Sequence, residues 1–231
     1  MIDWHSHILP GVDDGSRDPD ESLELLKMLK AQEIGTVIAT PHFHANFESP
    51  DQFCERRKAA YEELSGAIPE GMPKIRLGAE VRYYPGIEKM SDLKRLRIEG
   101  TRLLLLEMPM SKWTEYTVRE LIELAGSREI TLVLAHIERY LGMQKSDTWH
   151  RLYESGILMQ VNASFFTSLG TRHKAISYLR EGRIHFVGSD AHGITSRPPI
   201  IDKAFEMISK KLGKDFLDQM NEYGHSVLDR K

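Results

Sequence analysis

Short apolar runs alternate with longer amphipathic segments along the whole chain. The apolar runs have the length of β-strands and occupy residues 1–7, 36–42, 74–80, 102–107, 131–136, 157–162 and 184–190. Between them, leucines at helical spacing predict helices near 18–35, 51–66, 114–128, 145–155, 171–182 and 199–212. Strands that alternate with helices pair in parallel through right-handed crossovers. The pattern therefore predicts an α/β protein with seven parallel strands, in a doubly wound sheet or a closed barrel.

The polar residue that ends each apolar run favours the barrel. These ends carry His5 and His7, His42, Glu80, Glu107, His136, Asn162, and Asp190 followed by His192, with Asp13 and Asp14 in the loop after the first run. The carboxyl ends of all strands in a parallel barrel meet at one rim, so these residues would converge there. A lone histidine at a strand end is usually structural. A crowd of buried imidazoles and carboxylates is costly unless a cation neutralises it, and the set predicts a metal site.

The ligand types narrow the choice of metal without fixing it. Imidazole and carboxylate groups with no thiolate suit Mn²⁺, Fe²⁺ or Zn²⁺. The candidate ligands are too many for one ion, so two or three divalent ions that share a bridging carboxylate are expected.

Composition argues against several other classes of function. The chain has 231 residues, 28% of them charged, and a formal net charge of −3. It has no basic stripe, so no nucleic-acid partner is expected. No segment approaches the roughly 18–20 apolar residues that span a bilayer, and no signal-peptide pattern is present, so no membrane insertion is expected. Cys54 is the only cysteine, which favours a cytoplasmic location, and one domain over residues 1–231 is expected.

Five short motifs together resemble a known family. They are HSH near the start, TPH at 40–42, GAE at 78–80, HIER at 136–139 and SDAH at 189–192. In this order they are similar to the polymerase-and-histidinol-phosphatase (PHP) metal-dependent phosphoesterases. IDWHSHILPGVDDG, HIERY and the later RPP resemble the bacterial tyrosine-phosphatase branch of that family. The resemblance implies a distorted seven-stranded β/α barrel that dephosphorylates a tyrosine-phosphorylated protein, a bacterial tyrosine kinase that controls capsule and exopolysaccharide synthesis.

The resemblance also implies a division of the ligands among three ions, with Mn²⁺ favoured. One ion would be held by His5, His7, Glu80 and Asp190, a second by Glu80, Glu107 and His136, and a third by Asp14, His42 and His192. For His44 and Asp13 we expect roles behind the ligands or on the surface. His150, His173, His185 and His225 match no motif and are expected to be structural or exposed.

The expected mechanism is metal-assisted hydrolysis. Two ions about 3.5–4 Å apart can ionise a bridging water that attacks phosphorus. Arg139 and Arg197 would bind the phosphoryl oxygens, since arginine offers planar bidentate donors. The alternative route uses a cysteine with an arginine six positions later, but Ala60 stands six positions after Cys54. Cys54 is therefore not expected to take part.

Three alternatives remain open. One is a small-molecule phosphatase of the same family, such as one that acts on histidinol phosphate. Another is an amidohydrolase, although no lysine ends any of the seven runs to bridge the ions. The third is a non-catalytic module that metals only stabilise. A phosphotyrosine substrate needs an apolar surface for its ring, and the candidates for that surface are Phe43, Phe47, Trp113, Phe165 and Phe166.

Overall fold

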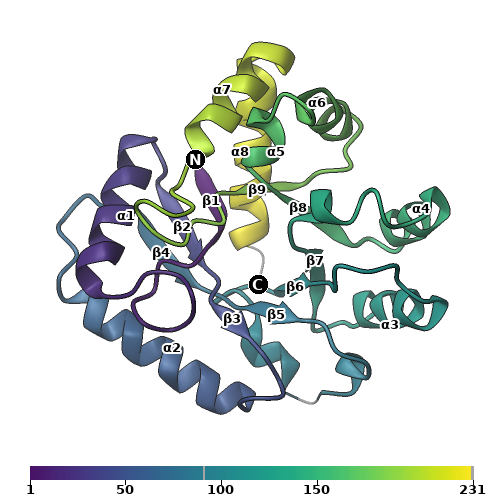
Figure 1. Cartoon of the computed structure of the whole chain (residues 1–231), viewed down its shortest axis with the longest axis horizontal. Helices are drawn as coiled ribbons and strands as arrows, with labels where there is room; N and C mark the ends of the chain where they lie inside the picture. Colours follow the sequence, from purple (N-terminus) through teal and green to yellow (C-terminus); the bar gives the residue numbers. More distant parts are fainter. Residues whose placement is uncertain (91, 230–231) are drawn as a thin grey trace.

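The computed structural model describes residues 1–90 and 92–229, which contain nine parallel strands. They are β1 (Ile2–Ser6), β2 (Thr36–Ala39), β3 (His42–Phe43), β4 (Lys74–Leu77), β5 (Glu80–Arg82), β6 (Leu103–Glu107), β7 (Thr131–Leu134), β8 (Leu158–Asn162) and β9 (Phe186–Gly188). One sheet has the order β1-β2-β4 and the other the order β3-β5-β6-β7-β8-β9. The two sheets form a curled parallel array with helices around it (Figure 1).

Each predicted apolar run contains a strand, but two of the runs are interrupted. One is broken around Pro41 into β2 and β3, because proline has no N–H to donate to the sheet. The other is broken around Gly78 into β4 and β5, where a Cβ atom would lie only 3.1 Å from Cγ1 of Ile98. Of the amino halves, β2 pairs with β1 and β4 pairs with β2; of the carboxyl halves, β3 pairs with β5, which pairs with β6. The curled parallel sheet is confirmed, whereas one closed barrel of seven continuous strands stays a prediction.

Hydrogen bonds link the first strand to the last one. The backbone N–H of Asp190 donates to the carbonyl of His5 at 2.8 Å, and that of His7 donates to Ala191 at 2.9 Å. Residues from the two ends of the sequence are thereby held side by side at the carboxyl ends of β1 and β9. This contact positions four of the nine predicted ligands, which are His5, His7, Asp190 and His192.

The six predicted helices are present. They are α1 (Pro19–Ala31), α2 (Pro50–Ser65), α3 (Glu115–Ala125), α4 (Ser146–Glu154), α6 (Arg172–Arg180) and α7 (Ile201–Leu212). Asp18 caps α1 by accepting the N–H of Glu21, and Ser49 with Gln52 forms a capping box at α2. The tail forms α8 (Lys214–Asp229), and its last two residues lie outside the described part. The short α5 (Ser164–Thr167) and the 3₁₀ helices η1 (Ile87–Lys89), η2 (Leu93–Leu96) and η3 (Ile137–Arg139) were not predicted. Among the described residues, no helix is long and apolar enough to cross a bilayer.

The apolar interior has two layers that alternate along the strands. In β6, Leu103 and Leu105 belong to an inner cluster, and Leu104 and Leu106 to a larger outer cluster that reaches the surrounding helices. The inner cluster also contains Ile2, Trp4, Ile38, Ile98, Val133, Ala135, Phe186, Val227 and Leu228. The last two come from α8, which packs against the amino ends of the strands. The carboxyl ends stay free for polar side chains.

Candidate metal centre

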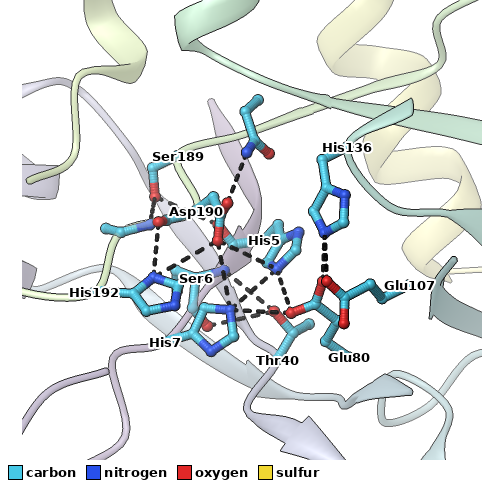
Figure 2. A network of polar contacts seen from close by, with 12 residues as sticks. His5, Ser6, His7, Thr40, Glu80, Glu107, His136, Ser189, Asp190 and His192 are labelled. Atoms are coloured by element: carbon cyan, nitrogen blue, oxygen red, sulfur yellow. Dashed lines mark hydrogen bonds and ion pairs between the residues drawn. The ribbon is translucent and has the colours of Figure 1, made fainter. Parts of the chain in front are cut away.

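The nine predicted metal ligands lie together where the predicted apolar runs end, and two of them, His42 and Glu80, begin the short strands β3 and β5. His5 belongs to β1, His42 to β3, Glu80 to β5 and Glu107 to β6, while His7, Asp14, His136, Asp190 and His192 lie in the segments that follow β1, β7 and β9. Figure 2 labels seven of these side chains and shows them pointing toward one another. The expected convergence therefore occurs in the structure, and its use for binding metal is argued below.

Glu80 is at the centre of the cluster. Its Oε2 atom lies 3.2 Å from Nε2 of His5, 3.3 Å from Nε2 of His7 and 3.0 Å from Nδ1 of His42. Its Oε1 atom lies 2.6 Å from Nε2 of His136. A carboxylate that faces ligands from four different segments is suited to bridging two ions.

The ligand atoms fall into three groups, and in each group the atoms lie within 4.8 Å of one another. The groups are His7, Asp14, His42 and His192; His5, His7 and Asp190; and His42, Glu80 and Glu107. His136 joins the third group through Glu80 and lies 3.7 Å from Glu107. The division implied by the resemblance gives His42 to one ion only. In the structure His42 lies between two groups, and so does His7.

The buried carboxylates of the cluster are paired with buried histidines, which shift each other's pKa. Burial would raise the pKa of Glu80, but the charge of His5 and a hydrogen bond with His136 lower it well below its ordinary value. Burial likewise opposes ionisation of Asp190, yet the charges of His5 and His7 lower its pKa. Burial would lower the pKa of His7, but hydrogen bonds with carboxylates, Asp13 first, raise it well above its ordinary value. These shifts favour ionised carboxylates paired with the imidazolium groups of His5 and His7, and bound divalent cations would supply positive charge to the same atoms.

Two buried histidine nitrogens without a hydrogen-bond partner in the described part of the chain show whether these residues fit a metal. Nδ1 of His42 and Nε2 of His192 are buried and make no hydrogen bond within the described residues. The former lies 3.0 Å from Glu80 without hydrogen-bond geometry, and the latter lies 3.5 Å from Oδ1 of Asp14. Buried polar atoms without a partner are rare in proteins, and these two face carboxylates. A divalent cation bound by these groups would satisfy both nitrogens, so the residues fit a metal site.

Side chains behind the ligands hold the ligands in position. Oδ2 of Asp13 lies 2.7 Å from Nδ1 of His7, and the hydroxyl of Tyr140 lies 3.1 Å from Nδ1 of His136. Gln160 accepts the backbone N–H of His136 at 2.6 Å. Contacts of this kind fix ring orientation and tautomer in metal sites. Asp13 was named from the sequence, but Tyr140 and Gln160 were not, although Gln160 is the one polar residue inside the apolar run before Asn162.

Two arginines reach the edge of the cluster. Nη2 of Arg139 and Nη2 of Arg197 each lie 2.6 Å from Oδ2 of Asp190, and the amide of Asn162 donates to the same oxygen at 2.6 Å. Both guanidinium groups are partly exposed, so they can also reach a ligand from solvent. Together they form a region that would bind an oxyanion beside the cluster.

The backbone is strained at the same place. His136, Asp190 and Arg197 have φ values of 33°, 55° and 57°, and Glu33 is the only other described non-glycine residue with positive φ. Such conformations cost on the order of 1–3 kcal/mol each and concentrate at functional sites. The strain directs the ligand that precedes η3, one ligand after β9 and one arginine toward a common centre.

The structure also assigns the remaining candidates. Of the five aromatic residues expected to receive a substrate ring, Phe43, Trp113, Phe165 and Phe166 are buried in the apolar core, so the prediction is wrong for them, and only Phe47 is exposed. Cys54 lies on α2, and its thiol donates to the carbonyl of Arg95, away from the cluster. His150, His173 and His225 are exposed, and Nδ1 of His185 accepts the backbone N–H of Met159.

Comparison with known proteins assigns the chain to a family. Residues 1–226 match the family described as capsular polysaccharide synthesis, CpsB/CapC, and the chain belongs to this family. It is 30% identical to the tyrosine-protein phosphatase YwqE of Bacillus subtilis (strain 168), over 99% of this chain and 91% of the relative. It is also 30% identical to the tyrosine-protein phosphatase CpsB of Streptococcus pneumoniae, over 92% and 91%.

A solved structure agrees with this assignment. The crystal structures of YwqE and CpsB, described as unique metal-dependent tyrosine phosphatases, include a chain that superposes with a TM-score of 0.82 and 26% identity. The match covers 100% of this chain and 96% of that one. The resemblance to the bacterial tyrosine-phosphatase branch is therefore confirmed.

Proposed function

We propose that this protein is a metal-dependent protein tyrosine phosphatase. The observation that carries the proposal is the cluster itself, in which eight imidazole and carboxylate side chains gather around Glu80 and two arginines reach its edge. Membership of the CpsB/CapC family and the activity of its named relatives support the same reading.

The finer features of this function are part of the proposal. We infer two or three ions, most readily Mn²⁺, held by His5, His7, Asp14, His42, Glu80, Glu107, His136, Asp190 and His192. We also infer a cytoplasmic enzyme whose substrate is a tyrosine-phosphorylated protein, a bacterial tyrosine kinase of capsule or exopolysaccharide synthesis. The family description supports a role in capsule synthesis, and the relatives' names support a tyrosine-phosphorylated substrate. The kinase follows from the resemblance alone, and the support for the ligands is their geometry.

The residues of the chain divide the work of phosphoester hydrolysis. When bound, divalent ions would lower the pKa of a water molecule and withdraw charge from the phosphoryl oxygens. Arg139 and Arg197 would exchange part of their contact with Asp190 for the phosphoryl oxygens and orient the phosphoryl group. Asn162 stays on Asp190 and keeps that carboxylate in position while the arginines move. Positioning and charge stabilisation of this kind account for most of the catalysis of phosphoryl transfer.

The test is reconstitution of the metal-depleted protein with Mn²⁺ and measurement of phosphate release from a phosphotyrosyl peptide. We expect His136→Ala to abolish turnover because Glu80 loses its 2.6 Å partner and the cluster loses a ligand. Arg139→Ala should lower kcat by about 100-fold or more with metal content intact, since it removes a donor to the developing charge. Cys54→Ser is the matched control and should keep full turnover.

The same assay separates the alternatives. Faster turnover of histidinol phosphate than of the phosphotyrosyl peptide would identify a small-molecule phosphatase. A metal-stabilised binding module would not hydrolyse p-nitrophenyl phosphate in its metal-loaded state, and it would lose stability when a chelator removes the metal. A large loss of activity in Cys54→Ser would contradict metal-assisted hydrolysis.

A further inference from the structure

A cavity of about 550 Å³ lies beside the metal-ligand cluster. Its lining includes, from the cluster, Asp14, His42 and Glu107 and, from outside it, His44, Phe47 and Arg82. We refer to it as the ring cavity. The function proposed above uses the first three of these residues and gives no role to the other three.

Phe47 is the most exposed large apolar residue that the structure describes, at 84%. The centroid of its ring lies 5.6 Å from that of His44, which in turn lies 5.7 Å from that of His42. A row of three rings therefore leads from a candidate ligand of the cluster to solvent. An exposed phenyl ring at the mouth of a cavity gains free energy when another ring covers it.

The chemistry of phosphotyrosine matches this row of rings. In an aryl phosphate the phosphate is joined to the ring itself, so a phosphoryl group held at the cluster brings its ring into the adjoining cavity. In phosphoserine a single methylene separates the phosphate from the backbone, and nothing in that side chain could contact Phe47. The cavity therefore favours an aromatic over an aliphatic phosphoester.

Arg82 adds a second requirement. It lies exposed at the end of β5 and lines the cavity, and its side chain makes no hydrogen bond or ion pair within the described residues. Arg56 lines the same cavity but is already held by Glu48 and by the carbonyl of Val12. Arg82 thus offers a guanidinium group that a carboxylate of the substrate can bind.

We propose that the ring cavity selects phosphotyrosine in an acidic segment of a protein substrate. The tyrosine ring stacks on Phe47 and His44, and a carboxylate from a neighbouring residue of the segment binds Arg82. This assignment rests on the proposed function, which concerns the cluster, and adds the specificity of the surface next to it.

The role of Phe47 is tested by comparing a ligand that has both a ring and a phosphate with one that has only the phosphate. The Mn²⁺-loaded wild type, Phe47→Ala and Phe47→Leu are compared by the KM for phenyl phosphate and by the inhibition constant of inorganic phosphate, which has no ring. We expect Phe47→Ala to raise KM about five- to tenfold, as the loss of an aromatic pair predicts, with a much smaller change in phosphate inhibition. Leu169→Ala is the matched control, since Leu169 is 78% exposed and lies outside the cavity.

Arg82 is tested by varying the peptide. Phosphotyrosyl peptides with acidic, alanine or lysine residues beside the phosphotyrosine are compared in wild type, Arg82→Ala and Arg82→Glu. The preference of wild type for the acidic over the alanine peptide in kcat/KM should fall about three- to fivefold in Arg82→Ala, the effect of a partly exposed ion pair. It should reverse toward the lysine peptide in Arg82→Glu. Arg102→Ala, at the exposed start of the β6 segment, should keep the wild-type preference.

Three outcomes would overturn the inference. They are an unchanged KM for phenyl phosphate in Phe47→Ala, equal losses for phenyl phosphate and inorganic phosphate, and an unchanged peptide preference in both Arg82 variants. Failure of the proposed function is a different result, because the wild-type protein would then release no phosphate from any phosphotyrosyl substrate.

Discussion

At their amino ends the strands of this protein are packed with apolar side chains, and at their carboxyl ends with imidazoles and carboxylates. Phe186, the first residue of β9, stacks on Trp4 with ring centroids 3.8 Å apart, and α8 adds Val227 to the same cluster. Asp190, four residues along the chain, is bound by two arginines and one asparagine. One strand therefore connects a region that stabilises the fold to a region that holds charge at a cost in stability.

The difference shows that stability and chemistry can be changed separately in this fold. Buried charges such as Glu80 and Asp190 gain little for folding, because their desolvation offsets their ion pairs. Buried rings at the amino end gain free energy by leaving water. Substitutions at the amino ends should therefore change stability more than activity, and substitutions at the carboxyl ends should change metal binding or activity more than stability. The predictions below use this contrast.

The largest expected effect is at the amino end. Phe186→Ala removes a ring that is 1% exposed and stacked on Trp4, and should lower the free energy of unfolding by about 3–5 kcal/mol. Urea unfolding of the metal-depleted protein measures this loss. The activity of the folded, Mn²⁺-loaded fraction should stay close to that of wild type. Tyr116→Ala, which removes a half-exposed ring on α3, should cost less than about 1 kcal/mol.

Much of this architecture could be predicted from the sequence. The run at 102–107 was predicted as a strand, and the two-residue period of a strand places Leu103 and Leu105 on one face of β6 and Leu104 and Leu106 on the other, as observed. The break at Gly78 could not be predicted, because it depends on a contact with the distant residue Ile98. The break at Pro41 has a local cause, the missing N–H of proline, but it was not predicted either. The division of the strands into two sheets follows from these breaks and was missed with them.

The next effect belongs to the carboxyl end. Asp13→Asn removes the charge that faces Nδ1 of His7 and should weaken Mn²⁺ binding about 10- to 100-fold, the range found for residues that orient metal ligands. Equilibrium dialysis against Mn²⁺ measures the affinity. Asp20→Asn makes the same change of charge in the first turn of α1 and should bind the metal like wild type. Equal losses in the two variants would mean that overall charge, and not the orientation of His7, controls affinity.

The sequence predicts which residues form the candidate site, but it does not predict how they are arranged within it. Every predicted apolar run brought the polar side chain at its end to the cluster, because parallel strands direct their carboxyl ends the same way. The sharing of His42 between two groups depends on the path of β3, which the sequence does not reveal. Loop aromatics were unpredictable for a similar reason, since Phe43 and Phe47 stand four residues apart and only the latter is exposed.

The smallest expected effect is a pH dependence at the amino end. Burial lowers the pKa of His185 from 6.5 to about 4, and its Nδ1 atom accepts the N–H of Met159 at 3.0 Å. As the pH falls from 6.5 toward 4, His185 becomes protonated in the unfolded chain but stays neutral in the folded protein. The free energy of unfolding therefore decreases over this pH range. His185→Gln keeps an acceptor but cannot be protonated, and it should remove about 1–2 kcal/mol of this decrease.

The loss of stability on acidification is measured by urea unfolding at pH 7 and pH 4.5. The metal-depleted proteins compared are wild type, His185→Gln and His150→Gln. His150 is an exposed histidine on α4, so its replacement should leave the pH dependence of wild type unchanged. If His185→Gln also lost stability on acidification as steeply as wild type, the acid sensitivity would come from the carboxyl end, where His192 has its pKa lowered to about 4 by burial and by the charge of His7. The two ends would then not differ in the way the pH prediction requires. Both the loss of stability in acid and the chemistry would come from the cluster at the carboxyl ends.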